Sequence, residues 1–152
     1  MDGLKRVILY IHGKGGSHLE AEQYKKNCYG FDMIGIDYHG YFPWIAQNEI
    51  QSVYKKAQES YDYVYVIANS IGVYFAMHAL QNYDIEKALF ISPVLDMERL
   101  ILDMMSWANV SEKDLCEKGE ISTDFGENLS WKYLCFVREN PVTWNVLTEI
   151  LY

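Results

Sequence analysis

The sequence predicts a doubly wound α/β domain, because short, mostly apolar runs alternate with segments of helical periodicity. Five runs read as strands, and they lie at residues 7–11, 33–36, 64–68, 88–91 and 147–152. Their continuous apolarity suits strands that are covered on both faces, as in a parallel sheet. Strand–helix alternation of this kind implies right-handed crossovers and therefore helices on both faces of the sheet.

Three helices are predicted between the first four strands. Ser17 and Glu20 match a capping box, which opens a helix that extends to about Asn27. Apolar residues between 46 and 61 fall on one helical face, and a third apolar helix is expected over residues 70–82. Each of these helices connects two predicted strands.

The alternation lapses between Pro93 and Trp144, where the pattern is read as helical throughout. Helices are expected over residues 97–108, from residue 111 onward, and over 130–139. A crossover needs fewer residues, so residues 94–144 are interpreted as a helical cap inserted into the single domain 1–152. Ligand sites of α/β sheets lie at the carboxyl ends of the strands, where such a cap would sit. An elaborate crossover is the alternative.

Composition and charge exclude several classes of protein. A chain of 152 residues is one domain of ordinary size, and its net charge is −8, from 13 basic and 21 acidic residues. Such a surface repels phosphate backbones and anionic lipids, so neither nucleic acid nor membrane is an expected partner. Three cysteines without a CxxC pair read as reduced thiols, and the N-terminal apolar run is too short for a signal peptide. A cytoplasmic protein without metal or cofactor is expected.

A glycine-rich loop, "HGKGGS" at residues 12–17, follows the first predicted strand. A Walker A loop fails because Lys14 precedes the paired glycines, and the dinucleotide fingerprint fails because His18 stands where its third glycine belongs. Glycines also let the backbone turn sharply and expose an N–H group that stabilises an oxyanion. Taken alone, the loop fits a tight turn equally well.

Ser70 lies in "ANSIG", between an apolar strand and an apolar helix. A nucleophile on a strained strand-to-helix turn needs small residues two positions to either side, and Ala68 and Gly72 meet that need. The turn would expose the hydroxyl and aim the Ile71 N–H at a substrate carbonyl oxygen. The alternative is a serine that only caps the helix.

Together, "HGKGGS", "IDYHG", "ANSIG" and "FISPV" resemble the core of a small α/β-hydrolase of the bacterial esterase-like type. The resemblance covers the whole chain. It implies Ser70 as nucleophile, and an oxyanion hole from the backbone N–H groups of Ile71 and of Lys14, which follows Gly13. It also implies strand order 2-1-3-4-5 in a mostly parallel five-stranded sheet.

The same resemblance implies an acid and a histidine after later strands, yet the sequence stops on the fifth predicted strand. A truncated hydrolase fold is therefore expected, with little activity of its own. Three residues are accessory candidates within the chain. His39 is the best internal candidate for the base. For His12 the alternative is a side chain that braces the loop, and for Asp96 the alternative is a helix N-cap.

The sequence thus predicts a serine hydrolase that cleaves a carboxylic ester or related acyl bond of a small-molecule substrate through an acyl-serine intermediate. Two alternatives remain: a non-catalytic small-ligand-binding protein on the same scaffold, and an acyltransferase. Because the last strand has an unpaired edge, a homodimer through that edge is also expected.

Overall fold

A computed structural model describes residues 3–152, which form two compact units. The first unit comprises the chain up to residue 95 together with residues 142–152, and the second is Asp96–Pro141. The first unit contains a parallel five-stranded sheet in the order β2-β1-β3-β4-β7. Its strands are β1 (Arg6–Ile11), β2 (Asp32–Gly35), β3 (Tyr63–Asn69), β4 (Ala88–Ile91) and β7 (Thr148–Leu151). The predicted fold class and strand order are confirmed.

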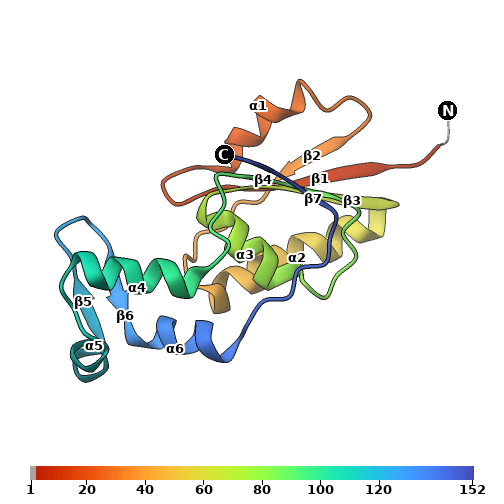
Figure 1. Cartoon of the computed structure of the whole chain (residues 1–152). Helices are drawn as coiled ribbons and strands as arrows, with labels where there is room; N and C mark the ends of the chain where they lie inside the picture. The colour runs from red at the N-terminus through yellow and green to blue at the C-terminus, as the bar shows by residue number, and fades with distance from the viewer. Residues whose placement is uncertain (1–2) are drawn as a thin grey trace. The chain divides into compact units, whose positions relative to one another are not determined.

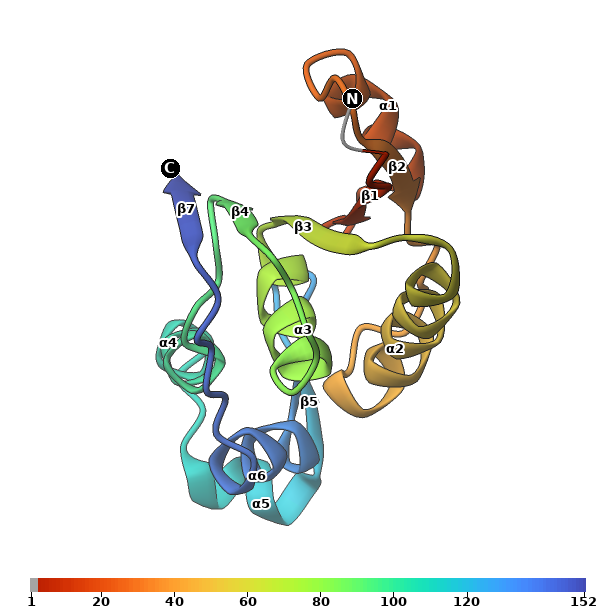
Figure 2. The same ribbon diagram turned by 90° about the vertical axis from the view of Figure 1, so that its right-hand side faces the viewer.

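Helices lie on both faces of this sheet. Figures 1 and 2 show α1 (Ala21–Lys25) on one face, and α2 (Pro43–Ser60) and α3 (Ile71–Leu80) on the other. The helix predicted from Ser17 to Asn27 is shorter than expected: a 3-10 turn, His18–Glu20, leads into the five residues of α1. Its predicted capping box is present: the Ser17 hydroxyl accepts from backbone N–H groups of the first turn, and the Glu20 side chain accepts from the Ser17 backbone N–H at 3.3 Å.

The apolar core lies mainly between the sheet and the helices α2 and α3. Strand residues that face these helices are almost completely buried: Leu9, Ile11, Val66, Ala68 and Phe90. The opposite face of the sheet is covered by α1 over part of its width, where Ile8, Tyr10 and Ile67 pack with Ala21. Burial on both faces explains why β1 and β3 are continuously apolar in sequence.

The second unit contains α4 (Met97–Trp107), α5 (Glu112–Lys118), β5 (Glu120–Ser122), β6 (Asn128–Ser130) and α6 (Trp131–Glu139). The expectation of helix throughout this region is wrong for residues 120–130, which form an antiparallel hairpin. Gly119, with φ 79°, ends α5, and Gly126, with φ 83°, lies in the hairpin turn. Such left-handed conformations favour glycine and interrupt a helix. The three predicted helices are present on either side.

Arg138 connects the three helices of the second unit. Its Nε donates to Glu98 on α4 at 2.6 Å, and its two terminal nitrogens donate to Glu112 on α5 at 2.5 and 3.0 Å. These hydrogen bonds lower the pKa of Glu112 and raise the pKa of Arg138 further above its usual value. A bidentate pair of this geometry orients α6 against its neighbours.

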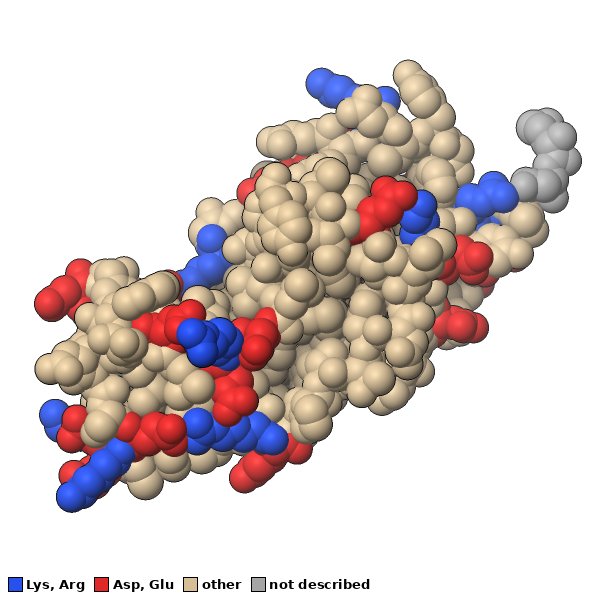
Figure 3. All heavy atoms as spheres, in the orientation of Figure 1, with Lys and Arg blue, Asp and Glu red and all other residues tan. Residues whose placement is uncertain are grey.

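Surface charge is mixed on the face shown in Figure 3. Lys and Arg side chains there lie singly or beside Asp and Glu rather than in one basic cluster. Within residues 3–152, no helix combines the length and the apolar character that crossing a bilayer requires.

Candidate active site

Ser70 occupies a strained turn between β3 and α3. Its backbone angles are φ 55° and ψ −123°, a conformation that is unfavourable for a residue with a side chain. Three hydrogen bonds hold this backbone in place: the Ser70 N–H donates to Ile91 at 2.9 Å, and its carbonyl accepts from Val73 and Val94, both at 3.1 Å. Surrounding structure therefore imposes the strain, which is typical of functional sites.

The side chain of Ser70 is exposed and does not cap α3. Although Ser70 stands at the N-cap position, its hydroxyl makes no capping hydrogen bond, so the helix-cap alternative is wrong. The Ile71 N–H belongs to the first turn of α3, where backbone donors lack intrahelical partners. An exposed hydroxyl thus stands at the N-terminus of α3, where the helix dipole favours negative charge.

Two glycines allow the loop after β1 to lie against this turn. A Cβ on Gly13 would meet the Cβ of Ser70 and the carbonyl oxygen of Asn69, both at 3.2 Å. A Cβ on Gly72 would lie 2.7 Å from the carbonyl oxygen of Ile11. Glycine at both positions lets the end of β1, the 12–17 loop and the start of α3 approach more closely than side chains would permit.

His12 braces the loop from inside. It is buried, its Nδ1 lies 2.8 Å from the carbonyl oxygen of Gly13, and its ring stacks on Tyr38 with centroids 4.4 Å apart. The Tyr38 hydroxyl donates to the His12 carbonyl at 2.5 Å, and burial raises the pKa of this phenol. Because a carbonyl only accepts, His12 carries its proton on Nδ1. These contacts fix the backbone that precedes Lys14.

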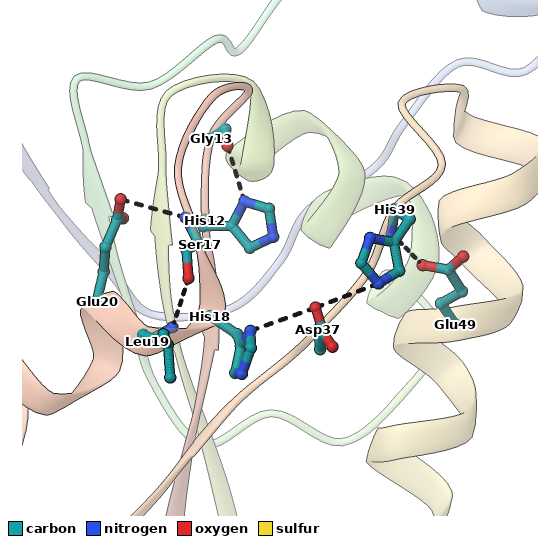
Figure 4. A network of polar contacts seen from close by, with 9 residues as sticks. All are labelled: His12, Gly13, Ser17, His18, Leu19, Glu20, Asp37, His39 and Glu49. Carbon is teal, nitrogen blue, oxygen red and sulfur yellow. Dashed lines mark hydrogen bonds and ion pairs between the residues drawn. The ribbon is translucent and has the colours of Figure 1, made fainter.

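His39 contacts Asp37 rather than Ser70. Its Nε2 lies 3.3 Å from Asp37 Oδ1, and the same oxygen lies 3.2 Å from His18 Nδ1, as Figure 4 shows. The backbone N–H of His39 donates to Glu49 on α2 at 2.8 Å. Asp37 therefore lies between two imidazoles just after the end of β2. All three side chains are substantially exposed.

Asp96 is the N-cap of α4, where its Oδ1 accepts from the backbone N–H of Arg99 at 3.0 Å. The cap interpretation accounts for this residue without a catalytic role. Among residues 3–152, no histidine ring is hydrogen-bonded to the Ser70 hydroxyl. In the same part of the chain, no three His, Cys, Asp or Glu side chains are grouped so that they could hold a metal ion.

The arrangement is similar to several solved hydrolase structures. Est1E from Butyrivibrio proteoclasticus superposes with a TM-score of 0.66 at 18% identity, covering 99% of this chain and 68% of that one. Mouse α/β-hydrolase domain-containing protein 10 gives 0.62 at 14% identity, covering 95% and 68%. One of the metagenomic epoxide hydrolases from hot environments gives 0.52 at 14% identity, covering 76% and 48%.

The chain has an α/β-hydrolase fold. At these identities the likeness concerns the fold, and the chain spans 68% of the length of the first two structures. No family model matches the sequence, and no curated protein sequence matches it significantly. Within the α/β-hydrolase fold, the strand that directly precedes Ser70, β3, is the central strand of the sheet.

Two features of this α/β-hydrolase fold were not predicted from the sequence. One is the contact of His18 and His39 with Asp37. The other is the hydrogen bond from Tyr10 to Glu20, two residues whose sequence patterns indicate only a strand and a capping box. The apolar run around Tyr10 contains a single polar group, the phenol, and that is the one signal that pointed to a partner across the sheet face.

Proposed function

We propose that this protein is a serine hydrolase that cleaves a carboxylic ester or related acyl bond, with Ser70 as the nucleophile. The observation that carries the proposal is the backbone of Ser70, which is held at positive φ with an exposed hydroxyl that caps nothing. Because the strained backbone of Ser70 does not serve a helix cap, it needs another explanation. Exposing the serine hydroxyl as a nucleophile is such an explanation. The α/β-hydrolase fold supports a hydrolase in general terms.

The chemistry proceeds in two steps. The Ser70 oxygen attacks the substrate carbonyl carbon, its proton passes to the leaving alcohol, and the C–O bond to that alcohol breaks to leave an acyl-serine. Water then attacks the acyl-serine, releases the carboxylic acid and restores the hydroxyl. In both steps the backbone N–H groups of Ile71 and Lys14 would donate to the negatively charged oxygen of the tetrahedral intermediate.

The first proton transfer needs a base, and within residues 3–152 the structure places none, histidine included, in hydrogen-bond contact with the Ser70 hydroxyl. A serine hydroxyl without a base is a poor nucleophile at neutral pH. We therefore expect the isolated chain to turn over slowly. Hydrolases deprived of their triad still retain about 10³–10⁴-fold catalysis over water through the oxyanion hole and binding.

A non-catalytic ligand-binding protein is the second candidate, and the same lack of a bonded histidine favours it. An acyltransferase differs from the hydrolase only in which acceptor replaces water. Three further predictions accompany the main proposal: residues 94–144 act as a cap, the compartment is the cytoplasm, and partners are small acyl substrates rather than nucleic acid.

The test is hydrolysis of p-nitrophenyl butyrate by the purified chain and by two variants, Ser70→Ala and Ser52→Ala. Ser52 is an exposed serine on α2, and its replacement serves as the matched control. We expect slow turnover that Ser70→Ala abolishes and Ser52→Ala leaves intact. Turnover that survives Ser70→Ala overturns the proposal, while retention of an acyl compound without turnover supports the binding protein.

A further inference from the structure

A buried tyrosine lies next to both segments that the proposed function uses. Tyr10 is on β1, on the sheet face covered by α1, and is fully buried. Its hydroxyl donates a 2.5 Å hydrogen bond to Glu20 Oε1. Strand β1 is paired with β3 here, with Tyr10 opposite Ile67, and β3 ends at Asn69, which directly precedes Ser70 in the elbow.

The carboxylate of Glu20 continues this connection into the 12–17 loop. Its second oxygen, Oε2, accepts from the Ser17 backbone N–H at 3.3 Å. A Cβ on Gly16 would lie 2.7 Å from Oε2, so the loop backbone passes directly over the carboxylate. The loop is closed at its other end by the Gly16 N–H, which donates to the Gly13 carbonyl at 3.1 Å.

We propose that Tyr10 and Glu20 are positioning residues that keep the 12–17 loop in register with the Ser70 elbow. The inference rests on the proposed function, and neither residue is expected to touch substrate. Its physical basis is that Glu20 joins the loop to Tyr10, and Tyr10 lies on the strand that is paired with β3, which leads into the elbow. Oxyanion donors are effective only within about 2.7–3.1 Å of the oxyanion, so the two segments must keep a fixed separation.

The inference is tested with Tyr10→Phe and Glu20→Gln. Phenylalanine removes the hydroxyl that donates to Glu20, and glutamine replaces one acceptor of Glu20 with a donor that faces another donor. We expect kcat for p-nitrophenyl butyrate to fall about 10-fold with little change in KM, because a displaced donor weakens the transition state rather than ground-state binding. The double variant should be no worse than either single one, since both act through one connection.

Two residues of α1, Tyr24 and Glu22, supply matched controls. Tyr24 stacks on Tyr10 with centroids 5.2 Å apart, and Tyr24→Phe removes a hydroxyl while keeping the ring. Glu22→Gln removes an exposed carboxylate of α1. Both controls should keep the kcat of the parent chain. A kcat that is equally low in the controls, or unchanged in Tyr10→Phe and Glu20→Gln, overturns the inference.

Amide hydrogen exchange supplies a readout that does not depend on activity. Exchange at residues 13–17 should accelerate in Tyr10→Phe and Glu20→Gln, while exchange in β3 and α3 stays unchanged. A merely stabilising role would accelerate exchange throughout the unit instead. If Ser70→Ala keeps the hydrolysis of the parent chain, the proposed function fails, and the exchange at residues 13–17 alone then decides whether this connection holds the loop.

Discussion

Gly72 and Ile11 are in contact through bare backbone: a Cβ on Gly72 would lie 2.7 Å from the Ile11 carbonyl oxygen. The carbonyl oxygen of His12 would be closer still. Helix α3 therefore begins directly against the end of β1, which brings the loop after β1 to the Ser70 elbow. The small residue two positions after the serine is a steric requirement of this contact.

Gly72→Ala should destabilise the chain by about 1–3 kcal/mol, because the added methyl group overpacks a site bounded by rigid backbone oxygens. Urea unfolding measures this loss, and the midpoint should fall without a large change in slope. Gly126→Asn is the matched control, since nothing lies within 4 Å of a Cβ there and asparagine tolerates positive φ. Equal stability of Gly72→Ala and the parent chain would contradict the contact.

A fluorophosphonate probe should label Ser70 slowly and incompletely. Labelling requires attack by the serine oxygen, and no histidine is bonded to that oxygen within residues 3–152. Intact-protein mass spectrometry over time gives the rate, with Ser70→Ala as the blank and Ser52→Ala as the control that keeps the signal. Rapid stoichiometric labelling would show that a base acts on Ser70 after all.

The inner strands β1 and β3 were predictable because they are buried on both faces. Ile8 and Leu9 point to opposite faces of β1, yet both are at most 5% exposed, so the run carries no alternation and reads as a parallel strand. The hairpin at residues 120–130 was missed for the opposite reason. Its strands have three residues each, which is too short for any hydrophobic period to show.

The candidate site was predictable only where local sequence determines it. Ser70 and Gly72 belong to one turn, whose sterics follow from a five-residue pattern. The contacts of Asp37 with His18, and of Tyr10 with Glu20, join residues on different elements. Such pairs follow from tertiary packing, and a single sequence contains no signal for the separation of two side chains across a sheet edge.

His78 should make the stability of the chain sensitive to acid. It is buried in α3, and desolvation lowers its pKa below the ordinary value of 6.5. Below pH 6.5 the unfolded chain takes up a proton that the folded chain resists, so the free energy of unfolding falls as the pH drops from about 6.5 toward the lowered pKa. Above pH 6.5 this contribution is intact.

Urea unfolding at pH 7.5 and at pH 5.5 checks this expectation. His78→Leu should reduce the loss of stability between the two pH values, because the titrating group is gone. His39→Gln is the control, since it replaces a histidine whose side chain is 80% exposed. The free energy of unfolding of this variant should change with pH much as that of the parent chain does. A His78→Leu variant as acid-sensitive as the parent would assign the effect to other groups.

Strand β7 is the edge of the sheet next to β4. The carbonyl of Leu147, just before the strand, accepts from the Ala88 N–H of β4 at 3.0 Å, and the carbonyl of Leu151 accepts from the Ser92 N–H just after β4 at 2.7 Å. Backbone groups alternate in direction along a strand, so those of Thr148 and Ile150 point to the open edge. Ile150 and Leu151 are themselves exposed, and an apolar edge of this kind invites pairing with another chain.

We therefore expect the chain to self-associate through β7, with the mass from light scattering rising with concentration. Ile150→Pro should abolish the association and keep the fold, because it removes an N–H that faces the open edge, and proline is tolerated at such positions. Glu149→Pro is the contrasting variant, since its N–H faces β4 and its loss should weaken the sheet itself. A strictly monomeric mass for the parent chain at high concentration would rule out this pairing.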